Sequence, residues 1–190
     1  MGRYPLACIA MVAVMGASLQ AAPATRPTTR AVELLCNGEL RYVPPPAPWE
    51  PKDRADTGRQ VGYVNGKWET MSVSVMAQPV SKLPPRKQLA DALVNGLTEQ
   101  YRKDGVQVLI WPRIEDDGRF HIKIRDRFHH KKWIAEQLHL YRIVGDRMVT
   151  VHMSTTHADP AAISAVHKVG EEVLLSFEPV SPTSPRPRPR

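Results

Sequence analysis

The chain has 190 residues, of which 42% are hydrophobic and 24% charged, and this composition is that of an ordinary globular protein with one domain. Its formal charge of +7 permits attraction to anionic polymers or membrane surfaces. No period of about 20 to 50 residues recurs, which argues against a repeat architecture.

The first 24 residues predict a secretory signal peptide. Arg3 is the basic start, an apolar run extends from Leu6 to Leu19, and small residues occupy 22–24. The alternative is a retained membrane anchor, but the run is shorter than the roughly 20 residues that span a bilayer. We therefore expect an exported protein, periplasmic or extracellular, with no transmembrane span in its mature chain.

Loss of the signal peptide would remove Cys8 and leave Cys36 as the only thiol, so no internal disulfide can form. The domain must then be held together by its hydrophobic core. Residues 25–31 read as a Pro/Thr-rich linker, 32–180 as a single domain, and 181–190 as a disordered Pro/Arg tail. The arginines of the tail are Arg186, Arg188 and Arg190.

The first half of the predicted domain begins with a strand near 38–43. The prolines of 44–58 predict an irregular loop, with Trp49 anchoring it to the core. Asn65-Gly66 predicts a tight turn between strands at 59–64 and 67–78. Apolar residues recurring every four positions predict a helix at 86–105.

The second half predicts four strands, at 106–115, 118–127, 133–144 and 147–154, joined by turns as a meander. A closing helix at 159–178 has Asp159 as its N-cap and Pro160 as its first residue. This order indicates an α+β fold, in which helices pack on an antiparallel sheet.

Three segments carry a family resemblance: "LRYVPP" at 40–45, "PPPAPWE" at 44–50 and "VLLSFEP" at 173–179. With the element order, they resemble the PsbP-like fold of photosystem II extrinsic subunits and of exported bacterial DcrB-like proteins. The resemblance implies an α/β/α sandwich and a binding or assembly protein without known catalysis. No ligand position of that family can be matched here.

The strand at 118–127 alternates apolar and basic residues, so one face is basic over its length. Only Asp126 stands against this charge in the sequence. One interpretation is a solvated outer strand; the other is contact with an envelope protein, an anionic polymer or a lipid surface. Export and the lack of a nucleic-acid-binding module argue against nucleic acid. The predicted patch comprises Arg119, His121, Lys123, Arg125, Arg127, His129, His130, Lys131 and Lys132.

No catalytic motif and no cofactor are predicted, so the leading hypothesis is an exported, non-catalytic binding or assembly module of the cell envelope. One alternative is a metal-binding protein or metal-dependent hydrolase, because His121 can converge with His139 or His152 on neighbouring strands. Another is an envelope scaffold tethered by the basic tail.

Overall fold

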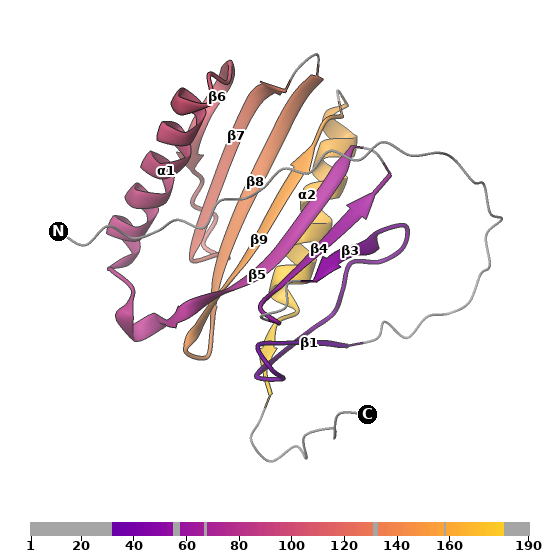
Figure 1. Ribbon diagram of the computed structural model, residues 1–190, viewed down its shortest axis with the longest axis vertical. Helices are drawn as coiled ribbons and strands as arrows, with labels where there is room; N and C mark the ends of the chain where they lie inside the picture. Colours follow the sequence, from indigo (N-terminus) through magenta and orange to yellow (C-terminus); the bar gives the residue numbers. More distant parts are fainter. Residues whose placement is uncertain (1–31, 55–57, 67, 131–132, 158, 181–190) are drawn as a thin grey trace.

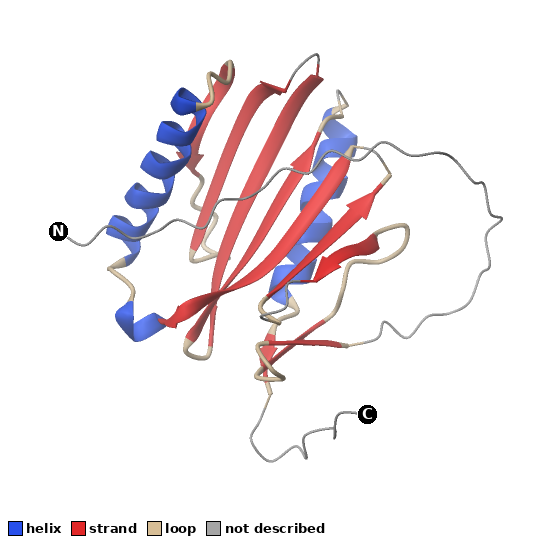
Figure 2. Cartoon of the chain, in the orientation of Figure 1, coloured by secondary structure: helices blue, strands red, loops and turns tan. Residues whose placement is uncertain are grey.

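The computed structural model describes residues 32–54, 58–66, 68–130, 133–157 and 159–180. Figures 1 and 2 show a broad sheet with a helix packed against each face. The predicted signal peptide, linker and tail, at 1–24, 25–31 and 181–190, lie outside the described residues.

The main sheet has seven antiparallel strands in the order β3-β4-β5-β9-β8-β7-β6. The predicted hairpin and the predicted meander are both parts of it, and the α+β prediction is confirmed. The strands are β3 (Glu50–Arg54), β4 (Gln60–Asn65), β5 (Glu69–Pro79), β6 (Val108–Ile114), β7 (Ile122–His130), β8 (Trp133–Val144) and β9 (Arg147–Thr155).

The two helices lie on opposite faces of this sheet. Helix α1 (Arg86–Lys103) follows the short 3₁₀ helix η1 (Val80–Lys82) and packs its Leu89 and Ala90 with Ile122 and Ile124 of β7. Helix α2 (Pro160–Leu175) packs into the larger core cluster with the inner residues of β4, β5, β8 and β9. Since successive side chains of a strand point to opposite faces, the residues of β7 that alternate with those under α1 face α2.

Both helices begin and end close to their predicted positions. Asp159 caps α2 by accepting a hydrogen bond from the backbone N–H of Ala161 at 3.0 Å. Gly105 follows α1 with φ +63°, a conformation that glycine adopts without strain. Neither helix of the described residues is long and apolar enough to cross a membrane.

A small second sheet joins the two ends of the domain. Strand β2 (Leu40–Tyr42) lies between β1 (Glu33–Leu35) and β10 (Glu178–Pro179), and both pair with it antiparallel. The ring of Tyr42 stacks on that of Phe177, with centroids 4.6 Å apart. Sequence reasoning found β2 but not β1 or β10, which are too short to show a pattern.

The prediction that 44–58 is irregular throughout was wrong, because β3 lies within it and pairs with β4. Pro51 is tolerated because β3 is an edge strand and needs hydrogen bonds on one side only. The anchoring role of Trp49 is confirmed, since its side chain is buried in the larger core cluster.

Candidate functional site

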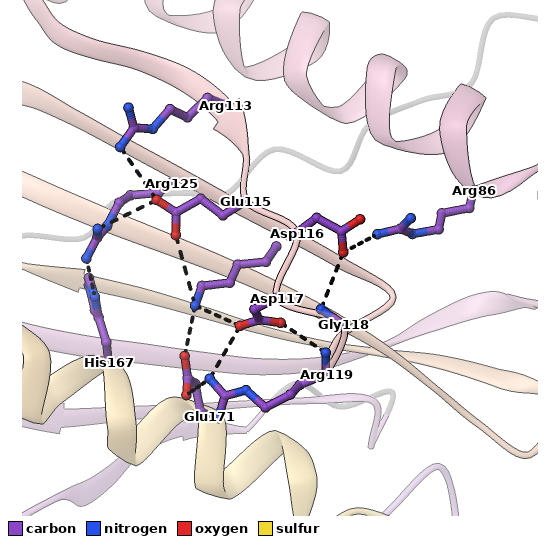
Figure 3. Close-up of polar contacts among 11 residues, drawn as sticks. Arg86, Arg113, Glu115, Asp116, Asp117, Gly118, Arg119, Arg125, His167 and Glu171 are labelled. Carbon is purple, nitrogen blue, oxygen red and sulfur yellow. Dashed lines mark hydrogen bonds and ion pairs between the residues drawn. The ribbon is translucent and has the colours of Figure 1, made fainter.

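The basic residues of β7 lie against helix α2. Lys123 and Arg125 alternate with Ile122 and Ile124, which are buried under α1, so their side chains project toward the opposite helix. Figure 3 shows Arg125 beside His167 of α2, and Arg119 beside Glu171 of the same helix and Asp117 of the turn that follows β6.

Two groups of ion pairs lie on this face of β7, and the first is centred on Lys123. Its Nζ lies 3.1 Å from Oε1 of Glu171 and 3.1 Å from Oδ2 of Asp117, and its side chain is only 14% exposed. Burial alone would lower the pKa of Lys123, but hydrogen bonds to the two carboxylates outweigh it and raise the pKa. Arg119 binds the other oxygen of Glu171, with Nη2 to Oε2 at 2.7 Å. Lys123 is therefore a fixed, fully ionised part of the structure.

The second group of ion pairs is centred on Glu136 of β8, a buried carboxylate. Arg125 reaches it through Nε at 3.1 Å, and Arg127 donates to it through Nε at 2.9 Å and through Nη2. Arg125 also contacts Glu115, with Nη1 to Oε1 at 3.6 Å. A buried carboxylate is stable only when paired, and the two guanidinium groups supply that pairing.

His167 of α2 is buried beside Arg125. Nη2 of Arg125 lies 3.3 Å from Nδ1 of His167, and because a guanidinium can only donate, Nδ1 accepts and Nε2 carries the proton. That Nε2 is buried with no hydrogen-bond partner among the described residues. Burial and the positive charge of Arg125 lower the pKa of His167 to about 4, so the ring is neutral at pH 7.

Around these groups lies a pocket of about 390 Å³ between β7 and α2. Lys168, on the exposed side of α2, forms no ion pair within the part of the chain that the structure describes. The side chain of Arg119 is 53% exposed at the pocket rim. An anionic group entering the pocket can therefore meet two accessible cations. The lining residues are Glu115, Arg119, Lys123, Arg125, Ser164, His167, Lys168 and Glu171.

The predicted basic patch is thus largely occupied by the protein's own carboxylates. Arg119, Lys123, Arg125 and Arg127 each form ion pairs, and His121 stands just before β7 with its pKa lowered by burial and by Arg86. His129 is half-buried near the end of β7; the side chain of His130 and all of Lys131 and Lys132 lie outside what the structure describes. That these residues bind an anionic partner stays a prediction.

Asp126 does not stand against this basic face, because its side chain is fully buried on the α1 side. Its Oδ1 accepts from the hydroxyl of Tyr101 at 2.8 Å, and its Oδ2 lies 3.1 Å from Nε2 of His139. The ring of His139 stacks on that of His152, with centroids 4.3 Å apart. Sequence reasoning missed this cluster, which joins a helix to three strands.

His121 was expected to converge with His139 or His152, but it stands before the first residue of β7, whereas register pairs His139 with His152 across β8 and β9. Within the described residues, no group of three or more His, Cys, Asp or Glu side chains is arranged to hold a metal ion. Nε2 of His139 is already engaged by Asp126. The metal-site alternative therefore lacks the third ligand that it requires.

No protein-family model matches the chain, and no curated protein matches it. Among solved structures, the Saccharomyces cerevisiae Ran-binding protein Mog1p matches with a TM-score of 0.52 and 14% identity, over 77% of this chain and 93% of that one. The chain has the PsbP-like fold. The resemblance seen in the sequence is thereby confirmed at the level of fold.

Two further structures match at lower scores. Cyanobacterial PsbP (CyanoP) from Synechocystis sp. PCC 6803 has a TM-score of 0.49 and 12% identity, over 84% of this chain and 98% of that one. A Bacteroides thetaiotaomicron protein has a TM-score of 0.49 and 9% identity, over 80% of this chain. The match spans only 49% of the Bacteroides chain, about half its length.

Proposed function

We propose that this protein is an exported, non-catalytic binding module of the cell envelope, and that the pocket between β7 and α2 receives an acidic group of a protein partner. The observation that carries the proposal is that Lys168 and the half-exposed Arg119 stand at the rim of the pocket, where Arg119 is also bound to Glu171 while Lys168 forms no ion pair among the described residues. The signal peptide expected at 1–24 supports export.

The chemistry of the pocket favours binding over catalysis. A general base works best with a pKa near the operating pH, whereas the pKa of His167 is about 4. Lys123 is held by Glu171 and Asp117, so it is not available as a deprotonated nucleophile. A rigid, internally neutralised pocket floor is well suited to position a partner rather than to transfer protons.

The accessible charges favour an acidic partner. Lys168 and Arg119 both present cations toward solvent, and the formal charge of +7 attracts acidic surfaces at a distance. The same fold serves a protein-binding role in Mog1p, a Ran-binding protein. We infer that the partner here is also a protein, with an aspartate- or glutamate-rich segment.

The proposal is tested by calorimetric titration of the purified protein with a hexaglutamate peptide. We expect saturable binding that weakens as salt rises from about 20 to about 300 mM, because the contact is electrostatic. Lys168→Glu should weaken binding by about fivefold or more. Lys82→Glu, an exposed lysine in η1, is the matched single-charge control.

Equal weakening by Lys82→Glu and by Lys168→Glu would mean that the peptide responds to overall charge alone, and the pocket would lose its assigned role. No saturable binding at low salt would overturn the acidic-partner proposal outright. Charge reversal at Lys123 is not a suitable test, since it would place a carboxylate beside Glu171 and Asp117 inside the structure.

A further inference from the structure

The sheet face that carries α1 is only partly covered by it. Helix α1 packs on β6 and β7, at one side of the sheet, while α2 lies on the other face (Figure 1). On the α1 side of β5 and β9, Met76 and Met148 join the cluster under α1, and the other described residues of these strands on that side are not part of it. These two central strands therefore have one face in the main core and one face that is open in the described structure.

The open face is polar and carries no formal charge. Register places Thr70, Ser72 and Ser74 of β5 opposite Ser154, His152 and Thr150 of β9. The residues that alternate with them, such as Val73 and Val151, are fully buried in the core. Burial, with a smaller contribution from His139, holds the pKa of His152 well below its usual value, so this ring is neutral at pH 7.

Two polar atoms on this side of β9 lack partners. Nε2 of His152 and Oγ1 of Thr156 are buried and have no hydrogen-bond partner among the described residues. Buried polar atoms are normally satisfied, and an unsatisfied one costs about 1–3 kcal/mol. Both atoms are buried, so a ligand on this face meets the half-exposed serine and threonine hydroxyl groups rather than these two atoms.

Two tryptophans stand at one end of the open face. Trp133 and Ala135 are two positions apart on β8, so they share a face, and Ala135 packs with Tyr101 of α1. The ring of Trp68 packs against it with centroids 4.5 Å apart, and Thr156 N–H donates to the carbonyl of Trp68 at 3.2 Å. The two side chains remain 41% and 40% exposed. Exposed aromatic pairs of this kind are typical of binding surfaces.

We propose that this face binds an uncharged oligosaccharide chain. A sugar ring has an apolar C–H face that packs on an aromatic ring and a rim of hydroxyl groups that exchange hydrogen bonds with serine and threonine. Neighbouring side chains on the face repeat at about 4.8 Å across the strands and about 6.7 Å along them, so a sugar chain lying on the face meets several hydroxyl groups. The lack of charge disfavours an ionic polymer, and the polar floor disfavours a lipid chain.

The test is titration of the purified protein with cellohexaose, chitohexaose and maltohexaose, followed by tryptophan fluorescence and calorimetry. We expect saturable binding of at least one hexasaccharide that does not change between about 20 and about 300 mM salt. Trp68→Ala combined with Trp133→Ala should weaken it by about tenfold or more. Trp111→Ala is the matched control, because Trp111 is equally exposed but lies on β6.

Ser72→Ala tests the floor separately, since it removes a hydroxyl with little change of volume and should also weaken binding. No saturable binding of any of the three sugars at millimolar concentration overturns the inference. Binding that survives the double tryptophan substitution would also overturn the inference. A dimer in sedimentation analysis that the same substitution abolishes would overturn it as well. Insensitivity to salt separates this site from the acidic-partner pocket, and either can fail without the other.

Discussion

Replacing Gly170 of α2 with alanine should destabilise the protein, although alanine is the better helix former. A Cβ at this position would lie 1.8 Å from Sδ of Met153, 2.9 Å from its Cγ and 3.0 Å from its Cε. Carbon and sulfur atoms in a packed core do not approach so closely, and Met153 is itself only 1% exposed. The methionine must therefore move within a filled space.

The two opposing effects can be compared. The gain in helix propensity from glycine to alanine is about 1 kcal/mol. Overpacking a filled core costs typically about 1–3 kcal/mol; the clashing atoms are the far end of a flexible methionine, but that side chain is itself buried and must find new space. We expect Gly170→Ala to lower the free energy of unfolding by up to about 2 kcal/mol, measured by urea denaturation followed by circular dichroism.

Met153→Ala is the informative partner substitution. Alone it should cost about 2–5 kcal/mol, because it leaves a cavity. In the double variant the new methyl group of residue 170 enters that cavity, so the two losses should be clearly less than additive. A Gly170→Ala variant more stable than the parent protein would show that helix propensity alone governs the site and would refute the close packing of α2 on β9.

Three further outcomes follow from the polar clusters. His167 has a folded-state pKa of about 4 against an ordinary value near 6.5, so between these pH values the unfolded chain binds a proton that the folded chain does not, and stability falls as the pH drops. Urea denaturation at pH 7 and pH 4.5 measures this loss of unfolding free energy. In His167→Gln the loss should be smaller than in the parent protein by up to about 3 kcal/mol. Tyr101→Phe should cost about 1–3 kcal/mol by urea denaturation, since it removes the donor to a fully buried oxygen of Asp126. Glu171→Gln should cost about 1–2 kcal/mol and lower the pKa of Lys123, measurable by NMR titration; an unchanged pKa would mean that Asp117 alone holds the ammonium group.

Local patterns were enough to predict most of the main sheet and both helices. The Asn65-Gly66 pair, the leucines of α1 and the Asp159-Pro160 start of α2 each encode their structure within a few residues. The edge strand β3 was not predicted, because its proline argues against regular structure, whereas an edge strand pairs on one side only and tolerates proline on the other. Strand β10 is defined by its pairing with β2, which lies over 130 residues earlier, and β1 is only three residues long.

The site was predictable only in part, for a related reason. Alternation correctly placed Lys123 and Arg125 on one face of β7, but their carboxylate partners come from other elements. Glu171 is 48 residues from Lys123 in the sequence, and Glu136 becomes a partner through the β7–β8 register. The charge pattern along one strand does not show which carboxylates a neighbouring strand or helix brings to it. In the sequence, the basic face therefore had no visible acidic partners apart from Asp126.

The pairing of β1 and β10 with the same strand gives the domain a single point of attachment. Val180 N–H donates to the carbonyl of Glu39 at 2.9 Å, so the last residue of the described chain is bonded just before β2. Figure 1 shows this small sheet at the end of the molecule remote from the β7–β8 turn. A tether at either end would therefore attach the domain at this small sheet, and both helices and the broad sheet would extend away from the attachment point.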